Sequence, residues 1–422
     1  MRERIIDVRF SPLSGHVEHR NRCPLSATSG HARLNEAMTQ QNSSRAREAW
    51  PYNFLVWGIV SALIAGSACV LYIYGSTRID AINSYYGRLL DRRELEGVYR
   101  AHYWKDGTIF WVGRRHLRRS DDLGITAAND IALPESFEGP ARFISESILA
   151  DKWNVYLRQG DQFKRVLRNF RCWYICGSRM QDGDFVVGEY GSRIYRLDIT
   201  GQALLLLEKP PETRHFHFTA VDAFTNDIYT SLGDAHKSSV TGIMRSEDNG
   251  KTWRWLHRAK DGLRETHRQP TAVYFDKDLI YFGADNRPNG IFTLNRNTGQ
   301  FEQAFVMDKF FKSWFLAITK AKGSFWAISR SFTNWPDRSF GVMWWSADGK
   351  NWIPIQIFED APVWLQTSAK RNLISVGFLR KDSNVVAFKL PDAAQMAEWV
   401  SRGPTITFVD RLLGRELRGP FH

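Results

Sequence analysis

The 422-residue sequence lacks the short motifs that mark several enzyme classes. It has no glycine-rich phosphate loop, no cysteine and histidine spacing typical of zinc sites, and no serine nucleophile elbow. A long amphipathic helix pattern is also missing from the segments that follow residue 95. These absences argue against nucleotide-driven chemistry, against triad hydrolases and against a helical fold.

Cysteine is scarce, with four residues in the chain, which is too few for a disulfide scaffold of this size. Cys23 lies near the start and Cys69 within an apolar run, so Cys172 and Cys176 form the one remaining pair. Positions four apart on a straight strand stand roughly 13 Å from each other, too far for a disulfide. The pair could bond only across a bend, and we predict two buried thiols.

Concentrated positive charge is rare, although the formal net charge is +12. Lysines and arginines alternate with acids along the chain, and residues 114–119 form the one dense basic cluster. The pattern predicts a generally cationic surface and no nucleic-acid partner. Such a surface would suit an anionic polysaccharide or acidic lipid headgroups.

Residues 54–74 form an apolar run without a charge. The run reaches the roughly 20 residues that a helix needs to cross a bilayer, and aromatic residues flank both of its ends. Arg45 and Arg47 precede it, whereas Arg78 and Asp80 offset each other after it. We therefore predict a single-pass membrane helix with the N-terminus in the cytoplasm and the C-terminal domain periplasmic or extracellular. A cleaved signal peptide and a buried soluble helix are the alternatives.

The predicted domains follow from this span. Residues 1–50 are polar and without periodicity, which predicts a disordered cytoplasmic tail, and Met38 is an alternative start. Residues 51–76 contain the membrane helix, residues 77–95 form a helical segment or stalk, and residues 96–415 form the ectodomain.

The ectodomain contains short strand-like runs that recur about every 40 to 50 residues, a period typical of one four-stranded propeller blade. The runs are residues 108–113, 154–158, 185–188, 228–232, 279–283, 324–329 and 373–378. We predict an all-β fold, a β-propeller of seven blades, with six as the alternative and a β-sandwich pair as the competing architecture. Residues 405–409 form a late strand that could complete the first blade and close the ring.

Residues 246–253 read Ser-Glu-Asp-Asn-Gly-Lys-Thr-Trp and predict a tight, self-bonded turn followed by an aromatic residue. Residues 120–127 and 346–352 repeat the pattern, the first without the tryptophan and the second one residue short. The pattern resembles the Asp-box, or BNR repeat, of sialidase-like β-propellers. The resemblance is best over residues 188–198 and 215–253, where the chain looks like uncharacterised, membrane-anchored bacterial members of that group.

The resemblance implies a propeller in which the Asp-box is a folding element that lies away from the active site. A sialidase would need an arginine triad, a Tyr/Glu nucleophile pair and an acid/base aspartate. The Arg-Ile-Pro segment usual before the first Asp-box is absent, and Arg142 follows that box instead. We therefore do not expect sialidase activity, although a glycosidase- or lyase-like site is compatible with the fold.

The most unusual polar cluster precedes the complete turn and follows what looks like an innermost strand at residues 185–188. Imidazoles and carboxylates in this pattern suit acid–base work or a divalent metal, and His215 and His217 share one side of a strand. Whether the protein is an enzyme stays open, because loop residues and blade-edge hydrogen bonds would leave the same pattern. The candidates are Glu189, Tyr190 and Asp234 as catalytic residues, Asp222, Asp285, Asn286 and Arg287 as ligand-binding residues, and His215, His217 and His236 as metal ligands.

Two functions follow. The first is a membrane-anchored extracytoplasmic propeller that binds or processes a carbohydrate, because the chain is rich in aromatic residues that can stack on sugars. The second is a non-catalytic scaffold with protein partners in a cell-envelope or polysaccharide-export assembly. The fold alone does not choose between them.

Overall fold

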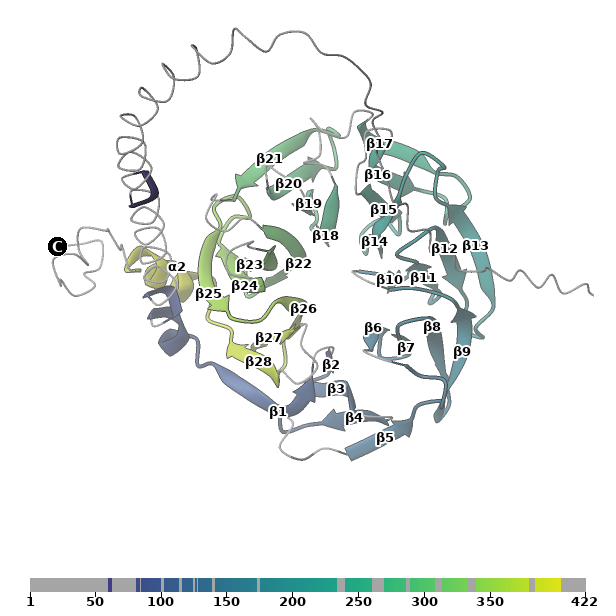
Figure 1. Cartoon of the computed structure of the whole chain (residues 1–422), viewed down its shortest axis with the longest axis horizontal. Helices are drawn as coiled ribbons and strands as arrows, with labels where there is room; N and C mark the ends of the chain where they lie inside the picture. Colours follow the sequence, from purple (N-terminus) through teal and green to yellow (C-terminus); the bar gives the residue numbers. More distant parts are fainter. Residues whose placement is uncertain are drawn as a thin grey trace, which may run out of the picture. The chain divides into compact units, whose positions relative to one another are not determined.

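The computed structural model divides the chain into two compact units, Met1–Leu71 and Tyr72–His422. In the first unit it describes residues 60–62, which are helical. In the second unit the described residues form seven four-stranded antiparallel sheets, which are arranged as blades around a common centre (Figure 1). The described residues are 60–62, 81–83, 85–99, 102–113, 116–123, 126, 128–138, 141–172, 175–233, 240–259, 269–285, 289–307, 313–332, 339–378 and 384–403.

The blades follow each other along the chain, and within each one consecutive strands pair from the centre outwards. Blade 1 contains β2 (His102–Lys105), β3 (Thr108–Gly113), β4 (His116–Ser120) and β5 (Ala128–Ala132). Blade 2 contains β6 (Arg142–Ser145), β7 (Ile148–Ala150), β8 (Asn154–Gln159) and β9 (Gln162–Arg168). Blade 3 contains β10 (Gly177–Arg179), β11 (Phe185–Gly188), β12 (Arg193–Leu197) and β13 (Ala203–Glu208). Blade 4 contains β14 (His215–Val221), β15 (Ile228–Gly233), β16 (Thr241–Ser246) and β17 (Arg254–Ala259).

The remaining blades keep the same order. Blade 5 contains β18 (Pro270–Phe275), β19 (Leu279–Ala284), β20 (Gly290–Asn295) and β21 (Phe301–Val306). Blade 6 contains β22 (Ser313–Ala321), β23 (Ser324–Phe332), β24 (Ser339–Ser346) and β25 (Ile353–Phe358). Blade 7 contains β26 (Pro362–Ser368), β27 (Leu373–Phe378), β28 (Asn384–Lys389) and β1 (Arg93–Tyr99).

The first strands of the blades contact each other in a closed ring, in the order β2, β6, β10, β14, β18, β22 and β26. The predicted all-β fold is confirmed, and the number of blades is seven. The segment at residues 185–188 is the second strand of its blade, not the innermost strand that the sequence pattern suggested. The second strands β15 and β27 are buried along their whole length, because neighbouring blades cover both of their faces.

Ring closure is achieved by the N-terminal strand. β1 pairs antiparallel with β28 and so becomes the outermost strand of blade 7, with Arg93 opposite Ala387 and Leu95 opposite Val385. Blade 1 already has four strands of its own. Residues 405–409, which were predicted to complete blade 1, lie outside the described part of the chain.

The helical segment before β1 packs against blade 6. Its residues 81–83 and 85–89 are helical, and Ile82 and Tyr86 are buried in the largest hydrophobic cluster. The side chain of Asn83 donates to the Ile357 carbonyl at 2.9 Å and accepts from the Ile357 N–H at 2.8 Å, which ties the segment to β25. The stalk boundary predicted at residue 95 falls within β1, and residues 81–90 belong to the packed body of the second unit.

Helix α2 (Ala393–Ser401) follows the last blade and lies against the same helical segment. The Asp392 side chain accepts from the Gln395 N–H at 2.7 Å and caps the helix, and Met396 is fully buried. The Tyr85 hydroxyl donates to the Trp399 carbonyl at 3.0 Å. Within the described residues, no helix is long and apolar enough to cross a membrane. Of the predicted span at residues 54–74, the structure describes residues 60–62 alone.

The complete copy of the repeated turn joins β16 to β17. The Ser246 hydroxyl accepts from the Gly250 N–H at 2.8 Å, and the Asp248 carboxylate accepts from the Thr252 N–H at 2.8 Å. The Trp253 indole N–H donates to the Gly250 carbonyl at 3.2 Å and so packs beneath the turn. The prediction of a self-bonded turn with an aromatic residue under it is confirmed.

The two incomplete copies lie between the third and fourth strands of blades 1 and 6. Ser346 accepts from the Gly349 N–H at 2.8 Å, and the Trp352 indole donates to the Gly349 carbonyl at 2.9 Å. In blade 1, Asp122 accepts from the Thr126 N–H at 2.9 Å. Hydrogen bonds of this kind lower the pKa of Asp122 to about 2, and the same holds for Asp248 and Asp348.

Cys172 and Cys176 form a disulfide, with their Cα atoms 5.5 Å apart. The prediction of two buried thiols is wrong, because the two residues do not lie on one straight strand. Cys172 precedes β10, and Cys176 makes an isolated bridge to Thr219 on β14. Their Cα atoms are therefore close enough for the two sulfur atoms to bond.

Candidate functional site

The upper face of the propeller is defined as the end at which the first strands begin and the second strands finish. Because neighbouring strands are antiparallel, both kinds of terminus meet at this end. His215 and His217 begin β14, Glu189 and Tyr190 follow β11, and Asp285 follows β19. Five of the predicted site residues therefore share the upper face, although they come from three blades.

Four of these side chains form a file of contacts across blades 3, 4 and 5, which we call the upper-face file. The ring centroids of Tyr190 and His215 are 4.3 Å apart, and those of His215 and His217 are 5.0 Å apart. His217 Nε2 lies 3.8 Å from Asp285 Oδ2, and both histidines are buried. The file joins an imidazole to a carboxylate, which is a pairing that can move protons.

Local backbone features place these rings. A β-bulge interrupts the pairing of β14 with β15 between Phe216 and Thr219, and His217 lies within this bulge, whereas His215 is paired opposite Gly233. Gly233, opposite His215, has no side chain, and a Cβ atom there would overlap the ring of His217. The glycine thus makes room for the buried imidazole.

The disulfide loop positions the other end of the file. The Tyr190 N–H donates to the carbonyl of Arg171, the residue before Cys172, at 2.5 Å. The Arg171 guanidinium lies 5.6 Å from the centre of the Tyr190 ring, within the range of a cation–π contact. The loop therefore fixes one cation next to the phenol of Tyr190.

Glu189 faces a different partner from its neighbour. Its carboxylate lies 3.0 Å from Nε of Arg193 and is 11% exposed. This hydrogen bond raises the pKa of the Arg193 guanidinium. Tyr190 contacts His215 instead, so the two adjacent residues do not meet as a nucleophile pair.

Several predicted residues cannot be placed. Asp234, His236, Asn286 and Arg287 lie outside the described residues. Within the ranges that the structure describes, no group of three or more His, Cys, Asp or Glu residues could hold a metal ion. The divalent metal at His215, His217 and His236 therefore stays a prediction.

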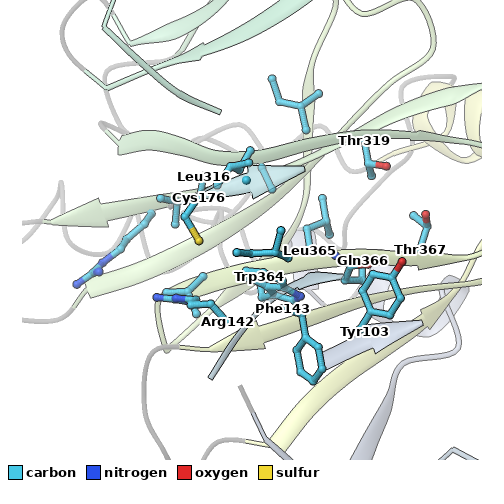
Figure 2. Close-up of a pocket in the computed structure, with 17 residues that line it drawn as sticks. Tyr103, Arg142, Phe143, Cys176, Leu316, Thr319, Trp364, Leu365, Gln366 and Thr367 are labelled. Carbon is cyan, nitrogen blue, oxygen red and sulfur yellow. The ribbon is translucent and has the colours of Figure 1, made fainter. Parts of the chain in front are cut away.

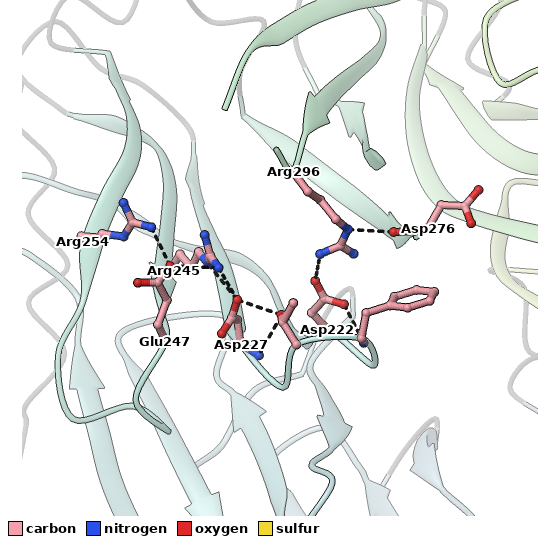
Figure 3. Close-up of polar contacts among 9 residues, drawn as sticks. Asp222, Asp227, Arg245, Glu247, Arg254, Asp276 and Arg296 are labelled. Carbon is pink, nitrogen blue, oxygen red and sulfur yellow. Dashed lines mark hydrogen bonds and ion pairs between the residues drawn. The ribbon is translucent and has the colours of Figure 1, made fainter. Parts of the chain in front are cut away.

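Asp222 lies at the opposite, lower face, at the turn after β14. It is fully buried, makes an ion pair with Arg296 Nη1, and accepts from the Phe224 N–H at 2.9 Å. Arg296 also donates to the Asp276 carbonyl at 2.8 Å, as Figure 3 shows. Asp222 thus joins blade 4 to blade 5 and is not part of the upper-face file.

A central cavity of roughly 300 Å³ lies among the first strands of blades 1, 2, 3, 6 and 7, and its lining was missed by the sequence analysis. Figure 2 shows the side chains of Arg142, Phe143, Trp364 and Tyr103 gathered around it. The described lining contains two arginines and no aspartate or glutamate. The lining residues that matter below are Tyr103, Arg142, Phe143, Thr319, Arg330, Trp364 and Gln366.

Neighbouring contacts hold the aromatic groups of the cavity in place. The Trp364 indole N–H donates to the His102 carbonyl at 2.7 Å, and the Arg142 guanidinium lies 5.9 Å from the Trp364 ring centre. The rings of Tyr103 and Phe143 are stacked with centroids 6.2 Å apart. Burial raises the pKa of the Tyr103 phenol, which keeps it protonated as a hydrogen-bond donor.

Residues at the start of β10 connect the cavity wall to β14. Ile175, Cys176 and Gly177 line the cavity, and the Ile175 carbonyl accepts from the Thr219 N–H on β14 at 2.9 Å. β14 also carries His215 and His217, but none of the four residues of the upper-face file lines the cavity.

Comparisons with known proteins support the fold and not an activity. No protein-family model matches the chain, and no curated protein matches it. A chain from a crystal structure of the mitotic checkpoint complex is 11% identical, with a TM-score of 0.51, and the match covers 71% of this chain and 91% of that chain. At this identity the likeness shows the fold alone.

Two further solved structures have lower TM-scores. A gluconolactonase from Xanthomonas campestris is 13% identical, with a TM-score of 0.41 and coverage of 58% of this chain and 82% of that chain. YCF48 bound to a D1 peptide is 10% identical, with a TM-score of 0.47 and coverage of 71% and 96%.

Proposed function

We propose that the protein is a membrane-tethered, extracytoplasmic β-propeller that binds an acidic carbohydrate in its central cavity. One observation carries this proposal: aromatic rings and two guanidinium groups line the cavity together, and the lining residues that the structure describes include no carboxylate. Flat rings offer apolar faces to the C–H groups of a sugar, and arginine is suited to pairing with a carboxylate.

The roles follow from the contacts. Trp364 provides the aromatic face on which a sugar ring stacks. The orientation of its ring is fixed because the indole N–H donates to the His102 carbonyl. Arg142 is 6% exposed and lies beside that ring, so its charge acts in a partly desolvated setting where electrostatic attraction is strong. Gln366 and Thr319 supply amide and hydroxyl groups for the sugar hydroxyls.

The proposed membrane anchor and the proposed extracytoplasmic location are supported by separate observations. The apolar run at residues 54–74 is long enough to span a bilayer. The disulfide between Cys172 and Cys176 is typical of proteins outside the cytoplasm. We expect the full chain to stay in the membrane fraction after alkaline carbonate washing, and its release would contradict the tether.

The ligand is tested by calorimetry with the full chain in detergent, using oligogalacturonic acid and the matched neutral galactose oligomer. The acidic oligomer should bind at least about tenfold more tightly than the neutral one. Arg142→Gln should remove this preference, because a charged hydrogen bond contributes about 1.5–3 kcal/mol. Trp364→Ala should weaken both ligands.

Trp153→Ala is the matched control, because Trp153 is an exposed tryptophan away from the cavity. The affinity of this variant for each of the two oligomers should equal that of the unaltered protein. Equal binding of the acidic and neutral oligomers, or an unchanged affinity in Trp364→Ala, would contradict the proposal.

A second candidate is processing of the bound sugar, which the 3.8 Å approach of His217 to Asp285 favours. The pair does not line the cavity, and it can carry a proton to or from a ligand that extends across the upper face. Turnover of any oligosaccharide that binds should fall in Asp285→Asn while its affinity is kept. Unchanged turnover would leave binding as the function.

A further inference from the structure

The outermost strand of blade 3, β13, has an unusually apolar surface. Leu204 is 61% exposed and Leu205 is 44% exposed, and Ile199 in the preceding turn is 66% exposed. β13 pairs with β12 on one side, and among the described residues no other strand pairs with it. The strand therefore presents a row of backbone groups together with large aliphatic side chains.

The other outermost strands are protected in ways that β13 is not. Five of them carry charges: β1, β5, β9, β17 and β21 contain Arg93, Asp130, Lys164, Arg254 and Glu302 respectively. β25 has no charge, but the helical segment at residues 81–90 packs on it. In β13 the one charged residue is Glu208, at its end. A charged or covered edge strand resists pairing with a strand of another chain. β13 lacks both kinds of protection and is therefore suited to such pairing.

We propose that β13 is the edge at which a second copy of this chain adds, by antiparallel pairing of the two β13 strands across a two-fold axis. The sequence of the strand, Ala-Leu-Leu-Leu-Leu-Glu, is apolar on both sides of its midpoint. Antiparallel self-pairing about that midpoint places Leu204 opposite Leu207 of the other copy and Leu205 opposite Leu206. A two-fold interface requires this kind of self-complementary patch.

The charge pattern also favours a second copy. In this register Glu208 of each copy lies opposite Ala203 of the other, so like charges do not meet. An acidic membrane surface would need lysines or arginines on the patch, and β13 contains neither. A bound lipid surface is therefore an outcome that the test must separate from the dimer.

The test measures the mass of the full chain in detergent by light scattering, corrected for the micelle. We expect a dimer, and Leu204→Lys with Leu205→Lys should raise the dimer dissociation constant at least about tenfold. Val306→Lys is the matched control, because Val306 is 57% exposed on the outermost strand β21. All variants should keep the circular dichroism spectrum of the unaltered protein, which shows that they remain folded.

A dimer that survives the double substitution, as a dimer through the membrane span would, overturns the proposal, and so does a monomer at every concentration. Crosslinking then locates the contact. In a background with Cys23→Ser and Cys69→Ser, Leu204→Cys combined with Leu207→Cys, which lie opposite each other in this register, should yield a covalent dimer under mild oxidation, and Val306→Cys should not. A crosslink that forms equally in both variants, or a monomer that floats with acidic lipid vesicles through β13, also overturns it.

Discussion

The lower and upper faces of the propeller place polar residues in different surroundings. On the lower face, the three Ser–Asp turns and the Asp222–Arg296 pair join neighbouring segments of the chain. Around the upper end of the channel, Glu189 also pairs with Arg193, but two arginines line a cavity and His217 lies 3.8 Å from Asp285. The most recognisable motif of the sequence thus belongs to the face that holds the structure together. Ligand binding is proposed for the upper face.

The largest expected effect tests the lower face. Asp222→Ala should lower the free energy of unfolding by about 3–5 kcal/mol, because it leaves the Arg296 charge, 12% exposed, without its buried carboxylate. Denaturant unfolding measures this loss. Carbohydrate binding by the folded fraction should be unchanged, and a selective loss of binding would break the contrast between the faces.

Arg254→Ala is the control for that measurement, because the ion pair of Arg254 with Glu247 on the same face is exposed. The Arg254→Ala substitution should lower the free energy of unfolding by at most about 1 kcal/mol. If Asp222→Ala and Arg254→Ala lowered the free energy of unfolding equally, burial would not decide the strength of these ion pairs.

The next prediction sharpens the account of the upper face. Gly233→Ala should displace the His217 ring, because the added methyl group overlaps it, and should lower the free energy of unfolding by about 1–3 kcal/mol. Turnover should fall more than sugar affinity, since the cavity lining does not include His217. Gly87→Ala serves as a control, because Gly87, like Gly233, has no left-handed backbone conformation and an added methyl group there would make only an ordinary contact. Displacement of His217 can be followed by the NMR shifts of its imidazole.

The smallest effect concerns the turns. Burial raises the pKa of Asp348, but hydrogen bonds from Asn351 and Lys350 outweigh it and lower the pKa to about 2. Because the folded-state pKa is below the unfolded value of 3.8, the stabilisation is full above that pH and is lost as the pH falls through about 2.

Asp348→Ala should therefore cost about 1 kcal/mol at pH 7, a value reduced for the exposure of the turn. Its unfolding midpoint should converge with that of the unaltered protein as the pH is lowered from 4 toward 2. A difference between the two that grows on acidification would contradict this account.

Much of the fold could be predicted from residues near each other in the chain. The hydrogen bonds of the turn at residues 246–253 join residues that are three or four positions apart in the chain. The local sequence pattern therefore predicts them directly. The placement of His215 and His217 on one strand was readable for the same reason. The disulfide was not, because the position of Cys176 relative to Cys172 depends on contacts with β14.

The candidate site was less predictable. Tyr190, His215 and Asp285 could be proposed from residue type, but their order in one file required the positions of three blades. Arg142 and Trp364 come from blades 2 and 7, and no local pattern joins them. Whether a side chain on a first strand points into the channel depends on the curvature of the ring.

The sequence by itself determined an all-β chain of repeated units with self-bonded turns, because strand periodicity and turn hydrogen bonds act over a few residues. The tertiary structure decided three features: closure of the ring by β1, the cavity shared by five blades, and the apolar edge at β13. Each depends on contacts between residues far apart in the chain or on which strand is left uncovered. Such relations arise only when all seven blades are packed together.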